Sequence, residues 1–294
     1  MIWRLAYLNS LLILFAFATH AQSGLEGIVV EKYYVSCEAD RADSLHSGNL
    51  PVGSVTYRIF VDLKPGYRFQ AAYGAPGHPL FIESTQLIYN HIEAGTTHPN
   101  VLPERTLSED IALLDSWLSV GAAGENHLGI PKTFDNEDVD EYITFDERFL
   151  KNKKNKKDIT PIERDGMQRS LSLPFPTFFQ MDTCLKHLGS STTGKRIETS
   201  NGAWACMGKG SMGVDSLTTN TILIAQITTA GDLSFQLNIM IGTPDGKSER
   251  YVAVNPAEGE LTHESLSYTT LKKQKTRKRG QQKKKKAEAA IKPS

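Results

Sequence analysis

The sequence has few cysteines, and none of them has the spacing that binds zinc. Cys37, Cys184 and Cys206 are the three cysteines of the 294-residue chain, and no two form a C-x-x-C pair. Structural zinc sites draw on closely spaced pairs of Cys or His, so this pattern excludes a thiolate zinc centre. A disulfide between Cys184 and Cys206 would contribute about 3 kcal/mol through loop closure. Three unpaired thiols are the alternative.

The sequence also lacks an apolar run long enough to span a membrane. The N-terminal run, Leu11–Ala18, falls well short of the roughly 20 residues that a spanning helix needs. Arg4 precedes this run and the small residues Thr19 and Ala21 follow it, which is the order found in a secretory signal peptide. We therefore predict a signal peptide over residues 1–21 and a secreted or cell-surface protein.

Sequence motifs of common catalytic and nucleotide-binding sites are missing as well. Neither H-E-x-x-H nor G-x-S-x-G occurs. Gly208, Gly210 and Gly213 match G-x-G-x-x-G in "WACMGKGSMGVDS", but the segment that follows is β-branched, whereas a dinucleotide fingerprint opens a helix there. The three glycines are predicted to form a wide loop between strands, and no nucleotide is expected.

The histidines show no catalytic pattern. His78, His98 and His127 fall in predicted loops, where functional residues gather, and each is expected to be a surface or capping residue. Paired carboxylates of a glycoside hydrolase meet in space and have no fixed sequence spacing. A noncatalytic secreted or cell-surface module that binds glycan, protein or envelope polymer is therefore favoured, and an exported hydrolase acting on polysaccharide remains the alternative.

Charge is balanced overall but strongly segregated. Of the 33 basic and 33 acidic residues, 11 basic and one acidic lie in residues 272–294; with Arg4 set aside, residues 22–271 keep 21 basic and 32 acidic residues. We predict an acidic body with a disordered basic tail. Lys283, Lys284, Lys285 and Lys286 are the candidate residues for binding an anionic surface polymer or polysaccharide.

Two acidic clusters are weak candidates for a calcium site. The first contains Asp138, Asp140 and Glu141 within "DNEDVDE" at 135–141. Carboxylate oxygens suit Ca²⁺, but the block lacks the glycine and the closing glutamate of an EF-hand loop. The second cluster is "CEADRAD", residues 37–43. Solvated acidic loops are favoured in both places, and no cofactor is expected.

The dominant period along the body is two, which indicates strands with one buried face. In "SVTYRIFVDL" the apolar face includes Tyr57, Ile59 and Val61, and in "DLSFQLNIMI" it includes Phe235 and Ile239. Further predicted strands are "LEGIVVEKYYVS", "RFQAAYG", "LFIESTQLIYN", "LLDSWLSVG", "TILIAQITT" and "RYVAV". Eight short strands with Gly, Pro or Asn boundaries predict a mainly β fold, an antiparallel β-sandwich.

Turn residues predict how neighbouring strands connect. "KPG" at 64–66 and "TAGD" at 229–232 are expected to close hairpins, and "GTPDGKSER" is a third turn in which Gly246 adopts positive φ. Residues 132–200 lose the period-two pattern and are predicted to be an irregular, partly disordered insertion, with a short helix near Asp182–Leu188. Residues 24–131 and 201–254 are expected to share one core.

Trp117 is the candidate ligand platform. Within "LLDSWLSVG", alternation places Leu114, Leu118 and Val120 on the core face and Trp117 on the other. A partly exposed Trp117 would stack on a ring-shaped ligand, and a tryptophan packed beneath a neighbouring loop is the alternative.

The strand segments carry a family resemblance. "GLEGIVVEKYYVS", "LPVGSVTYRIFVDLKPGYRFQAAYGAPGHPL", "LLDSWLSVGAA" and "ILIAQITTAGDLSFQLNIMIGTPDGKSERYVA" resemble a poorly characterised family of exported bacterial β-rich modules found in large secreted or cell-surface proteins. The resemblance covers about half of the predicted mature chain and implies an extracellular, surface-associated role. It brings no catalytic residues. A larger extracellular assembly is among the expected partners.

Overall fold

The computed structural model describes residues 23–38, 40, 44–109, 111–135, 165–189 and 194–271. The predicted signal peptide, the candidate calcium ligands Asp138, Asp140 and Glu141, and the basic tail with its lysines at 283–286 lie outside these ranges.

The fold is mainly β, and its paired strands run antiparallel, as predicted. A central sheet has the order β1(Leu25–Val35)-β2(Val55–Leu63)-β12(Asn220–Thr229)-β5(Trp117–Leu118). A second sheet has the order β10(Arg196–Thr199)-β4(Leu80–Ser84)-β13(Leu233–Gln236)-β16(Ser267–Thr269). The largest has the order β15(Ser248–Tyr251)-β14(Ile239–Gly242)-β3(Arg68–Tyr73)-β11(Ala203–Cys206)-β9(Pro176–Phe179). The smallest has the order β6(Ala122–Gly124)-β7(His127–Gly129)-β8(Met167–Arg169).

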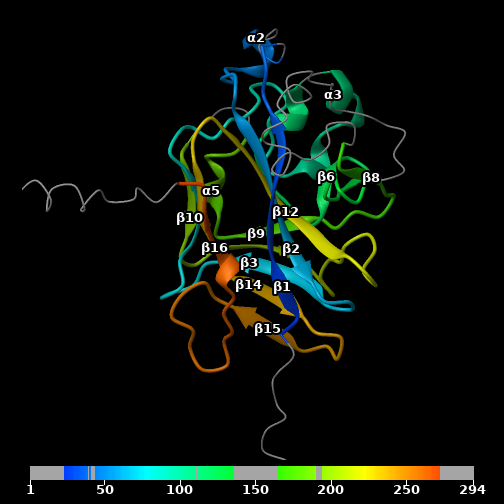
Figure 1. The fold of residues 1–294 in the computed structure, drawn as a ribbon, viewed down its shortest axis with the longest axis vertical. Coiled ribbons are helices and arrows are strands. Elements are labelled where there is room, and N and C mark those ends of the chain that lie inside the picture. Colours follow the sequence, from blue (N-terminus) through cyan, green and yellow to red (C-terminus); the bar gives the residue numbers. More distant parts are fainter. Residues whose placement is uncertain are drawn as a thin grey trace, which may run out of the picture.

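Short helical segments fill the connections (Figure 1). They are α2(Ser44–Ser47), η3(Pro99–Val101), α3(Glu104–Glu109), η4(Ile111–Leu114), α5(Asp182–Leu185) and η6(Glu264–Leu266). Helix α5 confirms the helix predicted near Asp182.

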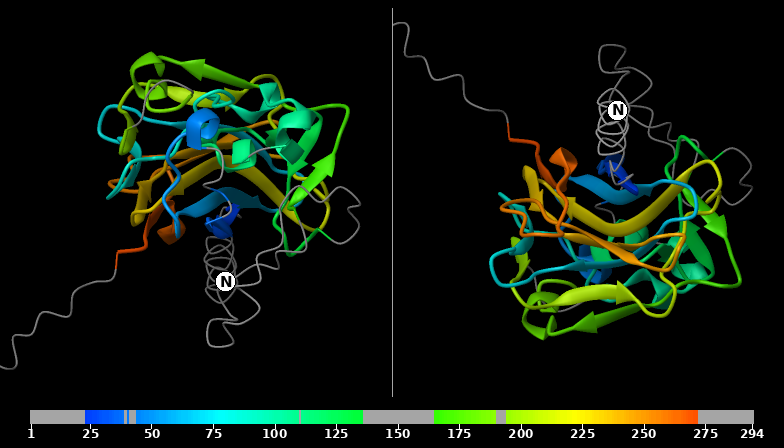
Figure 2. Two further views of the ribbon diagram at one scale, coloured as in Figure 1. Left: turned by 90° about the horizontal axis from the view of Figure 1, so that it is seen from above. Right: turned by 90° about the horizontal axis from the view of Figure 1, so that it is seen from below.

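The main hydrophobic core lies between the central sheet and the other two large sheets. Ile59 and Val61 on β2 pack in one cluster with Ile82 on β4, Phe235 on β13 and Ile239 on β14. These residues come from both segments that were predicted to share a core, and the shared core is confirmed. Figure 2 shows the strands as stacked layers, the arrangement of a β-sandwich.

The opposite face of the central sheet is also buried, which the period-two pattern did not predict. A second apolar cluster joins Tyr33 on β1, Phe60 on β2 and Leu223 on β12 to Leu107 on α3 and Met167 on β8. Every residue of β12 is therefore buried. Arg58, which alternates with the apolar residues Tyr57, Ile59 and Val61 on β2, is completely buried. These central strands are covered on both faces rather than half exposed.

The two predicted hairpins are instead crossings between sheets. The turn at 64–66 leads from β2 in the central sheet to β3 in the five-stranded sheet, and the turn at 229–232 leads from β12 to β13 in the second sheet. A tight turn has the same residue chemistry in both cases, so the turn residues could not distinguish them. The third turn is a true hairpin between β14 and β15, with Gly246 at φ 84°.

Two predicted segments differ in structure from the expectation. Within "LLDSWLSVG" only Trp117–Leu118 forms a strand, because residues 111–114 form the 3₁₀ helix η4. The region 132–200, predicted to be irregular, contributes β8, β9, α5 and β10 among its described residues. Strands β9 and β10 are edge strands of the two outer sheets, and such short edge strands have little apolar periodicity to reveal them.

Candidate functional site

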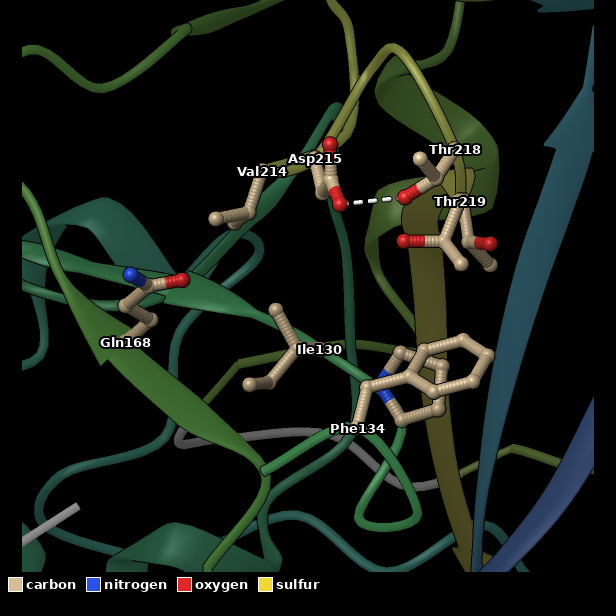
Figure 3. A pocket seen from close by; sticks show the side chains of 9 residues that line it. Ile130, Phe134, Gln168, Val214, Asp215, Thr218 and Thr219 are labelled. Atoms are coloured by element: carbon tan, nitrogen blue, oxygen red, sulfur yellow. Dashed lines mark hydrogen bonds between the residues drawn. The ribbon is translucent and has the colours of Figure 1, made fainter. Parts of the chain in front are cut away.

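A surface pocket of about 300 Å³ lies where the small sheet meets the end of β12 (Figure 3). The lining residues come from three separate parts of the chain. They are Ile130, Pro131, Phe134, Gln168, Val214, Asp215, Thr218, Thr219 and Thr221. The set combines an aromatic ring and aliphatic groups with hydroxyl, amide and carboxylate groups, which is the composition of a small-ligand site.

One wall of the pocket is a turn held by Asp215. The backbone carbonyl of Asp215 accepts hydrogen bonds from the amides of Thr218 (3.0 Å) and Thr219 (2.7 Å), and the Thr218 hydroxyl donates to its carboxylate. Gly213 seats this turn against β12, because a Cβ there would lie 2.6 Å from the Thr221 nitrogen. The last glycine of the G-x-G-x-x-G match thus has a packing role in a loop between β11 and β12.

The opposite wall is the segment from Ile130 to Phe134. The amide of Phe134 donates to the Pro131 carbonyl (2.8 Å), which closes a turn, and 47% of Phe134 is exposed. Figure 3 shows Phe134 and Ile130 across the pocket from the Asp215–Thr218 turn, with Gln168 at one side. A half-exposed aromatic ring therefore faces a wall of hydrogen-bonding groups.

A row of buried polar residues crosses the central sheet beside the pocket walls. Glu31 on β1 and Gln226 on β12 are the cross-strand partners of Arg58 on β2. Arg58 Nε donates to Gln226 Oε1 (2.9 Å), and its Nη1 donates to the Gly166 carbonyl (2.9 Å). The side-chain nitrogen of Gln226, Nε2, in turn donates to the backbone carbonyls of Leu113 (2.8 Å) and Asp115 (2.7 Å). Arg58 thereby joins the sheet to the segment that begins β8.

Lys132 completes a buried charged cluster around the ring of Tyr33. The Arg58 guanidinium carbon lies 3.4 Å from the centre of this ring and Lys132 Nζ lies 4.6 Å from it, both as cation–π contacts. The Lys132 amide donates to Glu31 Oε1 (2.8 Å), and the Tyr33 hydroxyl donates to the Asp165 carbonyl (2.5 Å).

Two buried aspartates, at 135 and 165, complete the set of charged side chains in this cluster. Asp135 Oδ2 accepts the Gly166 amide (2.7 Å), and Asp165 Oδ1 accepts the Met167 amide (2.8 Å). Ile130 adds a backbone bond to the Gly166 carbonyl (2.9 Å). These bonds therefore fix the segment that carries Phe134 to the segment that carries Gln168, and both segments to the central sheet.

Burial dominates the electrostatics of this cluster. It raises the pKa of Glu31, although Arg58 and Lys132 oppose the shift. Burial lowers the pKa of Lys132 to about 7, against the attraction of Glu31. Low dielectric penalises the charged form of each group, so both are displaced toward their neutral forms.

Few titratable side chains line the described part of the pocket. Asp215 is the one carboxylate and no histidine is present among the described residues that line it. Glycoside hydrolysis needs two carboxyl groups across the scissile bond. The described lining instead offers one aromatic ring and several hydrogen-bonding groups.

Trp117 is not a ligand platform, and the prediction of partial exposure was wrong. It is 1% exposed, because α3, η4 and the small sheet cover the second face of the central sheet. Its neighbour Asp115 is also buried, and its carboxylate accepts the amides of His91 (2.9 Å) and Thr96 (2.8 Å).

The other sequence-based candidates lie apart from the pocket lining. Cys184 and Cys206 are free thiols and form no disulfide, and Cys184 Sγ donates to the Glu198 carbonyl (2.6 Å). His127 is buried on β7, contrary to its expected surface position, while His78 Nε2 lies 3.2 Å from Glu260. Asp40 caps the amide of Cys37 (2.5 Å).

Sequence reasoning missed the pocket residues for a clear reason. Phe134 lies between a turn that contains Pro131 and an acidic block, and an isolated aromatic residue in a polar segment was the one available signal. Asp215 and Gln168 are 47 residues apart, so no local pattern joins them. Lys132 likewise carries no sign of its burial.

Comparisons with protein-family models, with curated proteins and with solved structures give no match for this chain. Within the described residues, no group of three or more His, Cys, Asp or Glu side chains is arranged to hold a metal ion. No helix in the described part of the chain has the length and apolar character that crossing a bilayer requires.

Proposed function

We propose that this protein is a noncatalytic secreted or cell-surface module that binds glycan through the pocket between Phe134 and the Asp215–Thr218 turn. The observation that carries the proposal is the placement of a half-exposed aromatic ring opposite a wall of hydroxyl, amide and carboxylate groups. Sugar rings present C–H groups on their faces and hydroxyls around their edges. An aromatic surface and convergent hydrogen-bonding groups match these two features.

The size and charge of the pocket narrow the ligand class. A volume of about 300 Å³ is at the lower end for small-molecule sites, which suits one sugar ring better than a long chain. Asp215 is the one charged side chain among the described lining residues. A neutral or amino sugar is therefore favoured over an acidic one, because a second carboxylate would be repelled.

Isothermal titration calorimetry of the mature protein against a panel of neutral, amino and acidic sugars tests this proposal. We expect heat of binding with a neutral or amino sugar, and about tenfold weaker binding for Phe134→Ala, equivalent to about 1.4 kcal/mol. Asp215→Ala should weaken binding further, since it removes both an acceptor and the partner of the Thr218 hydroxyl. Phe179→Ala is the matched control, because Phe179 is a similarly exposed phenylalanine on edge strand β9.

Gly213→Ala tests whether the position of the Asp215–Thr218 turn matters, because it leaves the polar side chains of the turn unchanged. The added Cβ would meet the backbone of Thr221 and displace the turn, so binding should fall although Asp215 and Thr218 remain. Binding that survives Phe134→Ala and Asp215→Ala together would overturn the assignment of the pocket. Shortened oligosaccharide products in the same mixtures would instead favour the hydrolase alternative.

The basic tail adds a second, nonspecific attachment to this proposal. Residues 272–294 carry 11 Lys or Arg residues and lie outside the described structure. Clustered cations bind polyanions by releasing counterions. The tail would hold the module on an anionic surface polymer while the pocket recognises sugar.

A further inference from the structure

We propose that Lys132 and Glu31 form an intramolecular amide bond, in which Lys132 Nζ is joined to Glu31 Cδ. The bond would link β1 to the segment that follows β7, and it does not depend on the proposed glycan site. Its basis is the placement in one buried cluster of an amine and a carboxyl oxygen, Lys132 Nζ and Glu31 Oε2, which have no hydrogen-bond partner within the described residues.

Contacts already bring these two residues together. The amide nitrogen of Lys132 donates to Glu31 Oε1 at 2.8 Å, so the carboxyl group is held beside the lysine backbone. Glu31 Oε2 and Lys132 Nζ are both buried, and within the described structure neither has a hydrogen-bond partner. An unpaired buried polar or charged group destabilises the fold, and one amide bond would remove both the free amine and the free carboxyl oxygen.

The surroundings of Lys132 limit where its amine can go. Nζ lies over the Tyr33 ring, and a Cβ at Gly166 would lie 3.1 Å from Lys132 Cγ and 3.0 Å from Arg58 Nη1. The glycine thus leaves room for the lysine stem against the Asp165–Met167 turn. Reaction requires Nζ to leave the ring face and turn toward Oε2, a rotation within the reach of a flexible four-carbon stem.

Burial favours the reactive form of each group. The lysine has a pKa of about 7 because of desolvation, so a large fraction of its amine is neutral and nucleophilic near neutral pH. Desolvation also raises the pKa of Glu31, which favours the protonated acid whose hydroxyl can leave. An ammonium facing a carboxylate would not react.

The atoms balance without any co-reactant. The Nζ lone pair attacks Cδ of the protonated Glu31 and forms the C–N bond. The buried Asp165 carboxylate takes a proton from Nζ and passes it to the Glu31 hydroxyl, the C–O bond breaks, and one water is released. Asp165 ends in its starting state, and the amide retains one N–H and one carbonyl oxygen.

Intact mass spectrometry of the purified, denatured mature protein tests this bond directly. We expect a mass lower by one water than the mass calculated from the sequence, and a proteolytic peptide that joins residue 31 to residue 132. Lys132→Arg keeps a cation in the cluster but should restore the full calculated mass. Lys247→Arg, at an exposed lysine, should retain the loss of water.

Glu31→Gln provides a chemically distinct check. An amide nitrogen would then be the leaving group, so the variant should lose ammonia rather than water and give the same linked peptide. The full calculated mass in the wild-type protein, with no linked peptide, would overturn the proposal even if the variants fail to fold. A link from Lys132 to Asp135 or Asp165 would overturn the assignment to Glu31.

Discussion

Arg58 and Gln226 form a 2.9 Å hydrogen bond between neighbouring strands at the centre of the fold, and both side chains are completely buried. A guanidinium in this position is tolerated because it is bonded on two sides and stacked on Tyr33. Glu31, Arg58 and Gln226 therefore form a buried polar row on the outer face of the central sheet. In a simple two-layer sandwich this face would be exposed to solvent.

Replacing Arg58 should strongly destabilise the protein. Arg58→Ala leaves Gln226, the Gly166 carbonyl and Glu31 buried without their cationic partner, and we expect a loss of about 3–5 kcal/mol in the free energy of unfolding. Urea unfolding followed by circular dichroism measures the change. Arg250→Ala, at an exposed arginine on β15, should shift the value by less than about 0.5 kcal/mol. Equal changes in the free energy of unfolding for Arg58→Ala and Arg250→Ala would contradict the structural role of Arg58.

Local alternation predicted one face of this sheet but not the other. Tyr57, Ile59 and Val61 were assigned to the core, and they lie there. Thr56 and Arg58 lie at alternate positions and are polar, and polar alternation is normally the sign of a solvated face. They are buried because α3, η4 and the small sheet cover them, and these segments lie far away in the sequence. The sequence of a strand does not indicate that distant segments will bury its second face.

The pocket was unpredictable for a related reason. Its walls come from residues 130–134, 168 and 214–221, and they meet only because the buried cluster fixes residues 130–135 to 165–167. Sequence reasoning placed residues 132–200 in an irregular insertion, since neither a helical nor a strand period runs through them. Charged residues within this stretch form the buried part of the support.

The strand face of β13 gives a paired test of the core. Phe235 is buried in the main core, where its ring stacks on Tyr268 with centroids 5.2 Å apart, whereas Gln236 is only partly buried. Phe235→Asp buries a carboxylate without a partner and should abolish soluble expression. Gln236→Asp loses one hydrogen bond to the Pro79 carbonyl and should still give soluble protein. Comparable soluble yields, measured after cell lysis, would refute the assigned face.

Asp115 should make stability depend on pH. Burial raises its pKa from 3.8 to about 8, even though the backbone amides of Thr96, His91 and Ser116 favour the ionised form. Between these two values the folded state binds more protons than the unfolded state, so the free energy of unfolding should fall as pH rises from about 4 to about 8. Asp115→Asn removes the titrating group and should flatten this decline. Urea titrations at several pH values measure the slope.

Glu258→Gln is the control for this pH series, because Glu258 is an exposed carboxylate. Its pH profile should match that of the wild type. An unchanged slope in Asp115→Asn would show that Asp115 is not the source of the dependence. The absolute stability of Asp115→Asn at low pH is less informative, since an asparagine side chain has one acceptor oxygen, whereas Asp115 accepts backbone amides through both of its oxygens.

The basic tail should bind anionic polymers in a manner that depends on salt. Residues 272–294 contain 11 basic residues and one acidic residue, whereas residues 22–271 have an acidic excess. Binding through clustered lysines weakens steeply as salt rises, because fewer counterions are released at higher salt. We expect the full-length protein to be retained on heparin or an acidic polysaccharide at low salt and to elute as salt increases. Deletion of residues 272–294 should abolish this retention.

Substitution of Lys283, Lys284, Lys285 and Lys286 by glutamine separates charge from chain length, because the tail keeps its full extent and loses four cations. This variant should elute at a lower salt concentration than the wild type, with a shallower dependence of the logarithm of affinity on the logarithm of salt. Sugar binding at the Phe134 pocket should not change. Retention that ignores salt, or that persists after deletion of the tail, would show that polymer attachment occurs on the acidic body instead.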